Sequence, residues 1–229
     1  MKLWLDTIDF SLIEDSCKLN ALAGVTTNPS ILAGSDADPE VIIRKLLDIQ
    51  PGGVAVQTTE TELPAIVKQA RRIAKISERI IIKIPAINDG FRAIAILEKE
   101  GIHTLATTIF EVKQIVFSGM LGATYAAPYV GRIESATGNA FQILSEAQNI
   151  ISKYHYDTKI MAAGIRTPEQ FIKCAALGIA AATIPEIVYK ELFSSNSDID
   201  LCLEKFNSAW QSNDLTARSN LFCCDRKNY

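Results

Sequence analysis

The chain has no long apolar run, no excess of positive charge and very little histidine. No stretch of its 229 residues approaches 18 consecutive apolar residues, so the sequence predicts no membrane-spanning helix. A formal net charge of −3 at pH 7 supplies no basic surface for nucleic acid. The first residues lack the cationic, apolar and small-residue series of a signal peptide, and we therefore expect a cytoplasmic protein.

Patterns typical of metal sites and disulfides are absent as well. The five cysteines are an odd number at no metal-like spacing, and only two histidines accompany them. The sequence therefore predicts no metal site, and we interpret the cysteines as free thiols that mostly serve as packing residues. They are Cys17, Cys174, Cys202, Cys223 and Cys224. We interpret the adjacent pair near the C-terminus as incidental.

Short apolar runs alternate with longer segments of helical period along the chain. Eight of the runs are typical of buried strands, and they begin near Lys2, Ala23, Gly53, Ile80, His103, Thr124, Lys159 and Ala181. Between them, apolar residues recur three and four positions apart, as at Val41, Ile42, Leu46 and Ile49. Strands that are apolar on both faces and separated by helices indicate a parallel sheet with helical cover. Eight such units predict a closed (β/α)8 TIM barrel.

An open doubly wound sheet is the alternative fold. It is disfavoured because no glycine-rich G-x-G-x-x-G loop follows the first strand. With 48% hydrophobic residues, the chain is long enough for one substantial core and too short for two enzyme domains. We expect the barrel over residues 1–195, an additional C-terminal amphipathic helix over 196–212 and a disordered tail over 213–229.

The predicted C-terminal helix carries an apolar stripe. The stripe consists of Ile199, Leu203, Phe206 and Trp210, which recur at helical spacing. A TIM barrel already has its eight helices, so this extra helix must bury its stripe on its own barrel or on a neighbouring subunit. The pattern alone favours neither surface.

One lysine stands inside a strand that is otherwise apolar. The run IIIKIP, residues 80–85, places Lys83 among β-branched residues, as in a buried strand. A buried ammonium is so costly that the group either finds a partner or loses its proton, and a neutral lysine is a nucleophile toward carbonyl carbon. The alternative is a strand-end lysine whose long side chain reaches solvent or a surface carboxylate.

The residues predicted to lie near Lys83 favour the catalytic interpretation. Active sites of such barrels lie at the carboxyl ends of the strands. The residues predicted at those ends are Asp6, Thr26, Thr27, Asn28, Gln57, Lys83, Thr107, Thr108, Tyr129, Arg132, Gly164 and Arg166. A barrel filled only for stability would carry Val, Ile and Leu there. Asp6 alone is typical of a helix cap, but beside an amine a carboxylate can position substrate hydroxyls or relay protons.

Five segments resemble a known family: LAGVTTNPSIL, IIKIPA, GIHTLATTIF, YAAPYVGRI and MAAGIRTPEQ. Together they are similar to the small transaldolase-like fructose-6-phosphate aldolases, from about Lys2 to Trp210. The resemblance implies a class I aldolase on a (β/α)8 barrel that uses neither metal nor cofactor. It also implies that Lys83 forms a Schiff base with a ketone. Asp6 matches the family's first-strand aspartate, Asn28 the asparagine that binds the donor, and Thr107 the threonine that positions a catalytic water.

Two further positions bear on the branch of the family. Classical transaldolases resemble the pattern with glutamate on the third strand and phenylalanine on the sixth, whereas this chain has Gln57 and Tyr129. An amide cannot exchange protons at neutral pH, so the phenol of Tyr129, acting through a water held by Gln57 and Thr107, is the better acid/base candidate. That combination looks like the aldolase branch, which releases free dihydroxyacetone. The alternative for Tyr129 is a barrel-wall aromatic whose hydroxyl is hydrogen-bonded.

A phosphate site is expected after the sixth and seventh strands. Arg132 and Arg166 supply guanidinium groups that suit phosphate, backbone N–H groups after Gly164 add donors, and Thr27 joins the substrate-binding residues. Surface salt bridges are the alternative use of the two arginines. The chain also departs from the family, which commonly has serine, phenylalanine and lysine at residues 164–166 and often asparagine at Gly131. These departures concern the acceptor aldehyde and leave the Schiff-base residues in place.

The sequence thus predicts a Schiff-base lyase that reversibly splits fructose 6-phosphate into dihydroxyacetone and glyceraldehyde 3-phosphate. A transaldolase that transfers the dihydroxyacetone unit between sugar phosphates is the first alternative. A barrel that binds sugar phosphates without turnover is the second. The family resemblance also implies a homo-oligomer, a decamer of two pentameric rings, in which the C-terminal helix packs on a neighbouring subunit.

Overall fold

The structure is a computed structural model that describes residues 1–212. These residues belong to two compact units, one formed by Met1–Leu192 and the other beginning at Phe193. The predicted tail over 213–229, with Cys223 and Cys224, lies outside the described residues. Within them, Cys17, Cys174 and Cys202 are free thiols.

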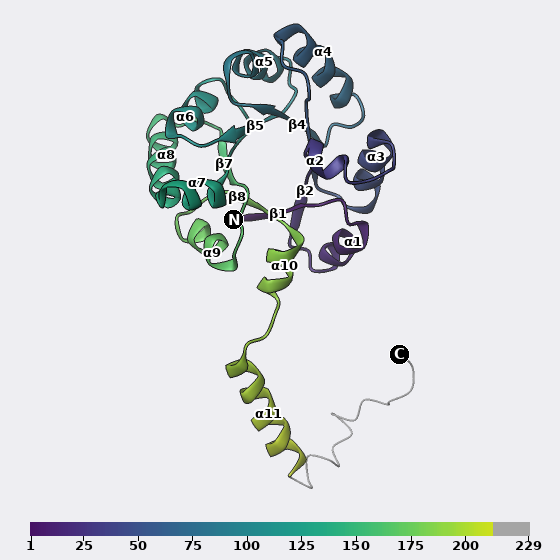
Figure 1. Cartoon of the computed structure of the whole chain (residues 1–229), viewed down its shortest axis with the longest axis vertical. Helices are drawn as coiled ribbons and strands as arrows, with labels where there is room; N and C mark the ends of the chain where they lie inside the picture. The colour runs from purple at the N-terminus through teal and green to yellow at the C-terminus, as the bar shows by residue number, and fades with distance from the viewer. Residues whose placement is uncertain (213–229) are drawn as a thin grey trace. The chain divides into compact units, whose positions relative to one another are not determined.

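The first unit is a closed barrel of eight parallel strands in sequence order, β1 to β8, with β8 paired to β1 (Figure 1). The strands are β1 (Lys2–Asp6), β2 (Leu22–Thr26), β3 (Gly53–Gln57), β4 (Ile80–Pro85), β5 (Thr104–Ile109), β6 (Tyr125–Pro128), β7 (Lys159–Ala162) and β8 (Ala181–Ile184). Each of the eight predicted runs forms one of them. The (β/α)8 fold is therefore confirmed, and closure of the sheet excludes the open doubly wound alternative.

Helices surround this barrel in the order expected of (β/α) units (Figure 1). They are α1 (Phe10–Lys18), α2 (Pro29–Leu32), α3 (Pro39–Ile49), α4 (Leu63–Ala74), α5 (Asn88–Lys99), α6 (Val112–Met120), α7 (Val130–Thr137), α8 (Ala140–Tyr154), α9 (Pro168–Ala176) and α10 (Glu186–Leu192). Side-chain caps fix several of the helix starts just after the strands. Asn28 accepts a hydrogen bond from the N–H of Ile31 and Thr167 accepts one from Gln170, so both helices begin close to the strand ends.

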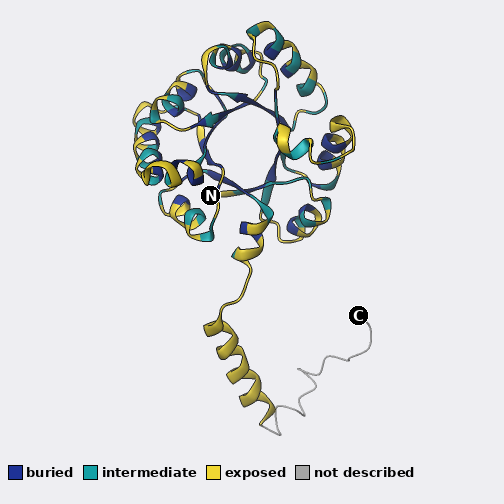
Figure 2. Ribbon diagram, viewed as in Figure 1, coloured by how far each residue is buried: buried dark blue, intermediate teal, exposed yellow. Residues whose placement is uncertain are grey.

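Residues of the barrel strands are largely buried (Figure 2). Alternation of side chains along each strand divides the core into two parts. On β4, Ile80, Ile82 and Ile84 belong to the outer core between strands and helices, whereas Ile81 belongs to the inner core inside the barrel. Because side chains alternate, Lys83 shares the inward face with Ile81. The strand thus hides its lysine in the barrel interior, where the active-site end of the fold is expected.

Apolar side chains fill the barrel below the level of Asp6 and Lys83. Trp4, two residues before Asp6 on β1, is 3% exposed and packs edge-on against Tyr125, with ring centroids 5.9 Å apart. The indole fits because its neighbours on β2 and β3 are Gly24 and Gly53, and a Cβ at Gly24 would overlap the ring. The inner core therefore forms a closed floor under the polar residues.

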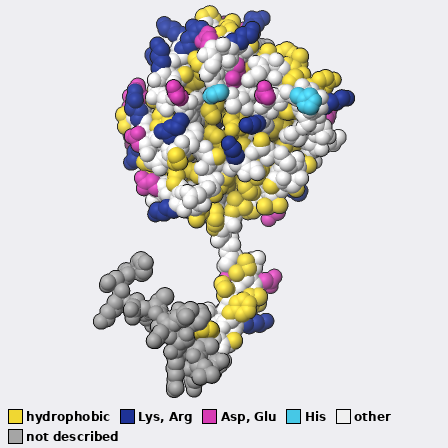
Figure 3. Space-filling view, turned by 180° about the vertical axis from the view of Figure 1, so that it is seen from behind, with side chains coloured by type: hydrophobic (Ala, Val, Ile, Leu, Met, Phe, Trp, Pro, Cys, Tyr) yellow, Lys and Arg dark blue, Asp and Glu magenta, His cyan; other side chains and the backbone are white. Residues whose placement is uncertain are grey.

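The second unit contains α11 (Ser197–Gln211), which begins after Asn196 accepts a hydrogen bond from the N–H of Ile199. This is the predicted C-terminal helix. None of its residues is buried, and its apolar stripe of Ile199, Leu203, Phe206 and Trp210 is 40–68% exposed. Figure 3 shows apolar side chains on the surface of this helix. What covers the stripe stays a prediction. No helix within residues 1–212 combines the length and the apolar character needed to cross a bilayer.

Candidate active site

The amine of Lys83 is buried and donates one hydrogen bond within the described part of the chain. Only 7% of the residue is exposed, and Nζ donates to the carbonyl oxygen of Thr27 at 2.6 Å. Burial lowers the pKa of Lys83, and the negative charge of Asp6 opposes this shift. The interpretation of Lys83 as a lysine that reaches solvent is therefore wrong. A buried amine with a depressed pKa, hydrogen-bonded to a neutral carbonyl, has the properties that a lysine nucleophile needs.

A short chain of hydroxyl groups leads to the carboxylate of Asp6. Oγ1 of Thr26 donates to Oδ1 of Asp6 at 2.6 Å and lies 2.7 Å from Oγ1 of Thr183. Because a hydroxyl has a single proton, Thr183 must donate to Thr26 when Thr26 donates to Asp6. The chain joins β8, β2 and β1 and fixes the carboxylate at the end of the first strand.

The phenol of Tyr129 is held at the other side of the site. Its hydroxyl oxygen lies 3.2 Å from Oγ1 of Thr107, and its ring meets that of Phe110 edge-on with centroids 5.5 Å apart. The guanidinium carbon of Arg132 lies 5.3 Å from the centre of the Tyr129 ring. The phenol is thus packed between an aromatic edge and a cation, with its hydroxyl directed to Thr107. This geometry satisfies the hydroxyl and also places it beside the predicted water-positioning threonine.

Most of the predicted residues surround one cavity of about 140 Å³ at the carboxyl ends of the strands. Its lining consists of Asp6, Thr26, Asn28, Lys83, Leu105, Thr107, Ala127, Tyr129, Arg132, Met161, Ala163, Gly164 and Thr183. A wider hollow of about 590 Å³ shares Asp6, Asn28, Tyr129 and Arg132 with it and is also lined by Gln57. Gln57 is paired in register with Lys83 but lies in the wider hollow, not against the inner cavity.

Two predicted substrate-binding residues lie outside both spaces. The hydroxyl of Thr27 donates to the carbonyl oxygen of Ala55 at 2.9 Å, and its own carbonyl holds Lys83. The guanidinium of Arg166 donates to the hydroxyl of Ser135 at 2.9 Å. Neither residue lines the cavity or the hollow, so Arg132 is the arginine that the structure brings to the site.

Gly131 and Gly164, the two glycines at which the chain departs from the family, are in direct backbone contact. The N–H of Gly131 donates to the carbonyl oxygen of Gly164 at 3.1 Å, and a Cβ at position 131 would overlap that oxygen. Gly164 has a φ of +62°, a left-handed conformation that side chains other than glycine rarely adopt. A serine at 164 and an asparagine at 131 therefore do not fit this backbone without adjustment.

Sequence reasoning missed several lining residues. Thr183 was not among the predicted site residues, although its place at the carboxyl end of the eighth strand, in the run AATIP, could have identified it. Met161 and Ala163 lie at inward positions of an apolar run and carry no chemical signal. Only a known strand register shows that such residues face the cavity.

Comparison with known proteins gives consistent results. Over residues 3–221 the chain matches the family described as Transaldolase/Fructose-6-phosphate aldolase. A protein named "Probable transaldolase" from Desulforapulum autotrophicum is 36% identical over 211 residues, which cover 92% of this chain and 98% of that protein. Proteins of the same name from Streptococcus pyogenes serotype M2 and Methanococcus vannielii are 38% and 34% identical. Those two matches cover 84% and 93% of this chain, and 90% and 98% of the relatives.

A solved structure with little sequence similarity shares the architecture. A flavocytochrome b2 with sulfite bound superimposes with a TM-score of 0.58 at 10% identity. The match covers 80% of this chain and 55% of the flavocytochrome chain, so this chain spans about half of that protein. At this identity the likeness concerns the fold alone.

Proposed function

The chain belongs to the transaldolase/fructose-6-phosphate aldolase family, whose members are enzymes of the aldolase or transaldolase type, and from that premise we propose that it is a Schiff-base (class I) aldolase. It cleaves fructose 6-phosphate into dihydroxyacetone and glyceraldehyde 3-phosphate and catalyses the reverse reaction. The observation that carries the proposal is the buried amine of Lys83 in a cavity that also holds the Tyr129 phenol. An amine and a proton-transfer group around one small space are what imine chemistry needs.

The reaction begins with attack of the Lys83 nitrogen on the carbonyl carbon, C2, of the ketose. Loss of water from the adduct leaves a protonated imine, which accepts the electron pair of the C3–C4 bond as that bond breaks. The proton of the C4 hydroxyl passes to a base, and carbons 4–6 leave as glyceraldehyde 3-phosphate. The remaining enamine takes a proton at C3, and hydrolysis of the resulting imine releases dihydroxyacetone and restores the amine.

Tyr129 is the proposed acid and base of these steps. Its hydroxyl lies beside Thr107, which can hold a water, and Gln57 in the adjoining hollow can hold the other side of that water. Asp6, fixed by Thr26, accepts hydrogen bonds from substrate hydroxyls or relays protons. The neutral amide of Gln57 contributes position and no proton.

Substrate binding is divided between the cavity and its mouth. Asn28 lines both spaces, where its amide can bind the dihydroxyacetone half, and Arg132 lines both, where its guanidinium can bind phosphate. Thr27 contributes through the carbonyl that orients Lys83. Backbone groups near Gly164 line the cavity, whereas a phosphate role for Arg166 requires its guanidinium to leave Ser135.

Transaldolase activity is the second candidate, and the names of the curated relatives favour it. Both reactions use Lys83, and they differ in whether the dihydroxyacetone unit leaves or waits for a second aldehyde. Gln57 and Tyr129 favour the aldolase. An assay for free dihydroxyacetone from fructose 6-phosphate, with no acceptor aldehyde present, separates the two. Release without acceptor supports the aldolase, whereas release only as a transferred unit supports the transaldolase.

The proposed assembly is a homo-oligomer, a decamer of two pentameric rings as the family resemblance implies. The exposed apolar side chains of Ile199, Leu203 and Phe206 on α11 support it, since apolar surface of this kind commonly marks a contact between chains. Burial on a neighbouring subunit would remove these side chains from water.

Borohydride trapping tests the Schiff base directly, because reduction fixes only a true imine. The protein is incubated with dihydroxyacetone or fructose 6-phosphate, reduced and mapped by peptide mass spectrometry. We expect one adduct, on Lys83, and none in Lys83→Met. A matched control, Lys18→Met, removes an exposed lysine paired with Asp15 and should retain the adduct. A folded protein that binds sugar phosphate but gives no adduct would support a binding barrel without turnover and refute the mechanism.

A further inference from the structure

We propose that Gln114 is a positioning residue, which fixes the position of the Tyr129 phenol through the backbone at the end of β5. The inference rests on the proposed function, since it concerns the proton-transfer step of that reaction. Gln114 lies on α6 and lines neither the cavity around Lys83 nor the adjoining hollow. Its influence must therefore pass through residues 107–111, here called the β5 exit.

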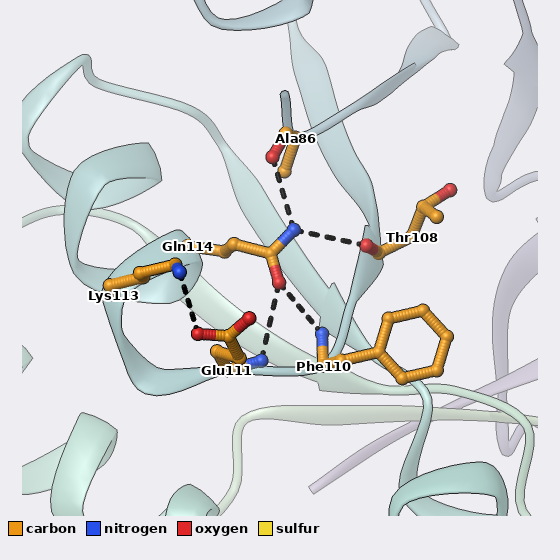
Figure 4. Close-up of polar contacts among 6 residues, drawn as sticks. All are labelled: Ala86, Thr108, Phe110, Glu111, Lys113 and Gln114. Atoms are coloured by element: carbon orange, nitrogen blue, oxygen red, sulfur yellow. Dashed lines mark hydrogen bonds and ion pairs between the residues drawn. The ribbon is translucent and has the colours of Figure 1, made fainter. Parts of the chain in front are cut away.

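The side-chain amide of Gln114 makes four hydrogen bonds, all to backbone groups (Figure 4). Nε2 donates to the carbonyl oxygens of Ala86 and Thr108, both at 3.1 Å. Oε1 accepts from the N–H groups of Phe110 at 2.9 Å and Glu111 at 3.2 Å. A primary amide has two N–H donors and two lone pairs, so its capacity is filled.

An ordinary helix start explains only part of this arrangement. Glu111 and Gln114 form a capping box, in which the glutamine accepts the hydrogen bond from the backbone of Glu111. The donor half of the amide is not needed for that cap. It reaches instead to Ala86, which directly follows β4, and to Thr108, near the end of the neighbouring strand β5.

Those two strands carry the chemistry. Ala86 stands three residues after Lys83 on the β4 side, and Thr108 directly follows Thr107 on β5. The strand ladder pairs Pro85 with Thr107, and the N–H of Ala86 donates to the carbonyl of Thr107 at 2.8 Å. Beyond that bond, Gln114 continues the connection, because its amide binds the backbone of both segments at once. It therefore fixes the β5 exit relative to the strand that carries the nucleophile.

The β5 exit needs such support because its backbone is strained. Thr108 has a φ of +60°, which is unfavourable for a β-branched residue and persists only where the surroundings enforce it. The pairing of β5 with β6 is also irregular between Ala106 and Ile109. Gln114 binds the carbonyl of Thr108, inside this irregular stretch, and the N–H of Phe110, just after it. The Thr108 side chain points away from the amide (Figure 4).

Tyr129 depends on the β5 exit through three contacts. Its N–H donates to the carbonyl of Ile109 at 3.0 Å, its ring meets that of Phe110, and its hydroxyl lies beside that of Thr107. Relaxation of Thr108 toward an unstrained backbone would move all three partners together. Misplacement of a reacting group by about 1 Å can cost on the order of 100-fold in rate.

Two variants separate the halves of the amide. Gln114→Met keeps the length and removes all four hydrogen bonds. Gln114→Glu keeps the acceptor oxygen but sets a carboxylate against the carbonyls of Ala86 and Thr108, which repels them unless the carboxyl is protonated. The matched control is Gln148→Met, because Gln148 on α8 donates only to the hydroxyl of Ser152 within the described residues.

The measured quantities are kcat for fructose 6-phosphate cleavage and the rate of borohydride trapping at Lys83 with dihydroxyacetone. We expect Gln114→Met to lower kcat about 10- to 100-fold, while trapping stays within about twofold of wild type. The kcat of Gln114→Glu should fall similarly at pH 8. Relative to wild type it should recover toward pH 5, where a protonated carboxyl can donate a hydrogen bond again. Gln148→Met should change neither rate. Equal losses of trapping and turnover, or wild-type kcat in a folded Gln114→Met, would overturn the inference.

A readout independent of activity keeps the inference apart from the proposed function. With 13C-labelled tyrosine, the ring signals of Tyr129 should shift in Gln114→Met and Gln114→Glu and stay in place in Gln148→Met. If wild type forms no Lys83 adduct, the proposed function fails while this measurement still decides the role of Gln114. Unshifted Tyr129 signals in both folded variants would refute it.

Discussion

The side-chain nitrogen of Lys83 lies 2.6 Å from the carbonyl oxygen of Thr27, beside a cavity at the carboxyl ends of the strands that Asp6 also lines. A carbonyl can accept a hydrogen bond from a neutral amine as well as from an ammonium, so this contact is compatible with both protonation states of Lys83. Burial disfavours the charge, and only the carboxylate of Asp6 restrains the fall in pKa. The protonation of Lys83 is therefore set by the balance of those two influences.

That balance predicts the pH dependence of imine formation. Only the neutral amine attacks a carbonyl, so the rate of trapping with dihydroxyacetone should rise with pH and level off below 10.5, the ordinary pKa of lysine. Asp6→Asn removes the charge that raises the pKa of Lys83, so the midpoint of this rise should move to lower pH. Stopped-flow or quenched trapping from pH 5 to 10 measures both curves. A midpoint that moves upward in Asp6→Asn would contradict the assignment.

The same pKa affects folding stability. Between the depressed pKa in the folded protein and 10.5 in the unfolded chain, the unfolded state binds more protons, so stability rises with pH through that window. Lys83→Met has no such dependence and should be more stable than wild type at pH 6, by on the order of 1 kcal/mol. Its advantage should shrink as the pH approaches 10.5. Urea unfolding at several pH values tests this prediction. A difference in the free energy of unfolding that does not change with pH would show that the pKa of Lys83 is not depressed.

Removal of the phenol oxygen should separate imine formation from proton transfer. Tyr129→Phe keeps the ring contacts with Phe110 and Arg132 but loses the hydroxyl beside Thr107. We expect free dihydroxyacetone release to fall about 10²- to 10⁴-fold, the usual contribution of a positioned acid or base, with the Lys83 adduct retained. Coupled assays of both products provide the measurement. Undiminished release would remove Tyr129 from the mechanism.

The contact between Gly131 and Gly164 gives a prediction about stability. An alanine inside a helix is ordinarily better than glycine by about 1 kcal/mol, but at 131 its Cβ would overlap the Gly164 carbonyl. Gly131→Ala should therefore destabilise the protein, by about 1–3 kcal/mol. Gly164→Ala has space for its Cβ, whose nearest atom is 3.8 Å away, and should cost about 1 kcal/mol from its positive φ. A stabilised Gly131→Ala in thermal unfolding would contradict the overlap.

Loss of the C-terminal helix should reduce the size of the assembly. A chain that ends before Asp198 lacks α11 and its apolar stripe, and we expect a smaller oligomer or a monomer by light scattering in solution. Circular dichroism should show that the barrel remains folded, because residues 1–192 form a compact unit of their own. An unchanged oligomer would place the subunit contacts elsewhere.

The architecture could be predicted from the sequence because its signals are local and repeated. Runs such as IIIKIP are too short and too β-branched for helices, and eight of them separated by helical segments leave few possible topologies. The strand register adds what the sequence does not show. The fit of Trp4 between Gly24 and Gly53 depends on which residues of three strands stand level, and that is fixed only when the barrel closes.

The candidate site was predictable where chemistry is unusual for its position. A lysine in an apolar strand is conspicuous, and so is a set of polar residues at the strand ends. Arg166 had the same appearance as Arg132, yet it is turned to Ser135, because side-chain direction after a strand is decided by local packing. Gln114 gave no signal, since a glutamine in the first turn of a helix resembles any other exposed polar residue.

The apolar floor formed by Trp4, Ile81 and Tyr125 closes the inner end of the candidate site, so a substrate approaches Lys83 from the carboxyl ends of the strands. In the proposed reaction, a ketose phosphate therefore reaches Lys83 with its carbonyl end first and its phosphate last. After cleavage the aldehyde fragment lies nearest the opening of the cavity. It therefore departs before the dihydroxyacetone unit that is bound covalently to the lysine. In this proposal, release or transfer of the dihydroxyacetone unit depends on which reactant reaches it first through the same opening. Water releases it, whereas a second aldehyde accepts it.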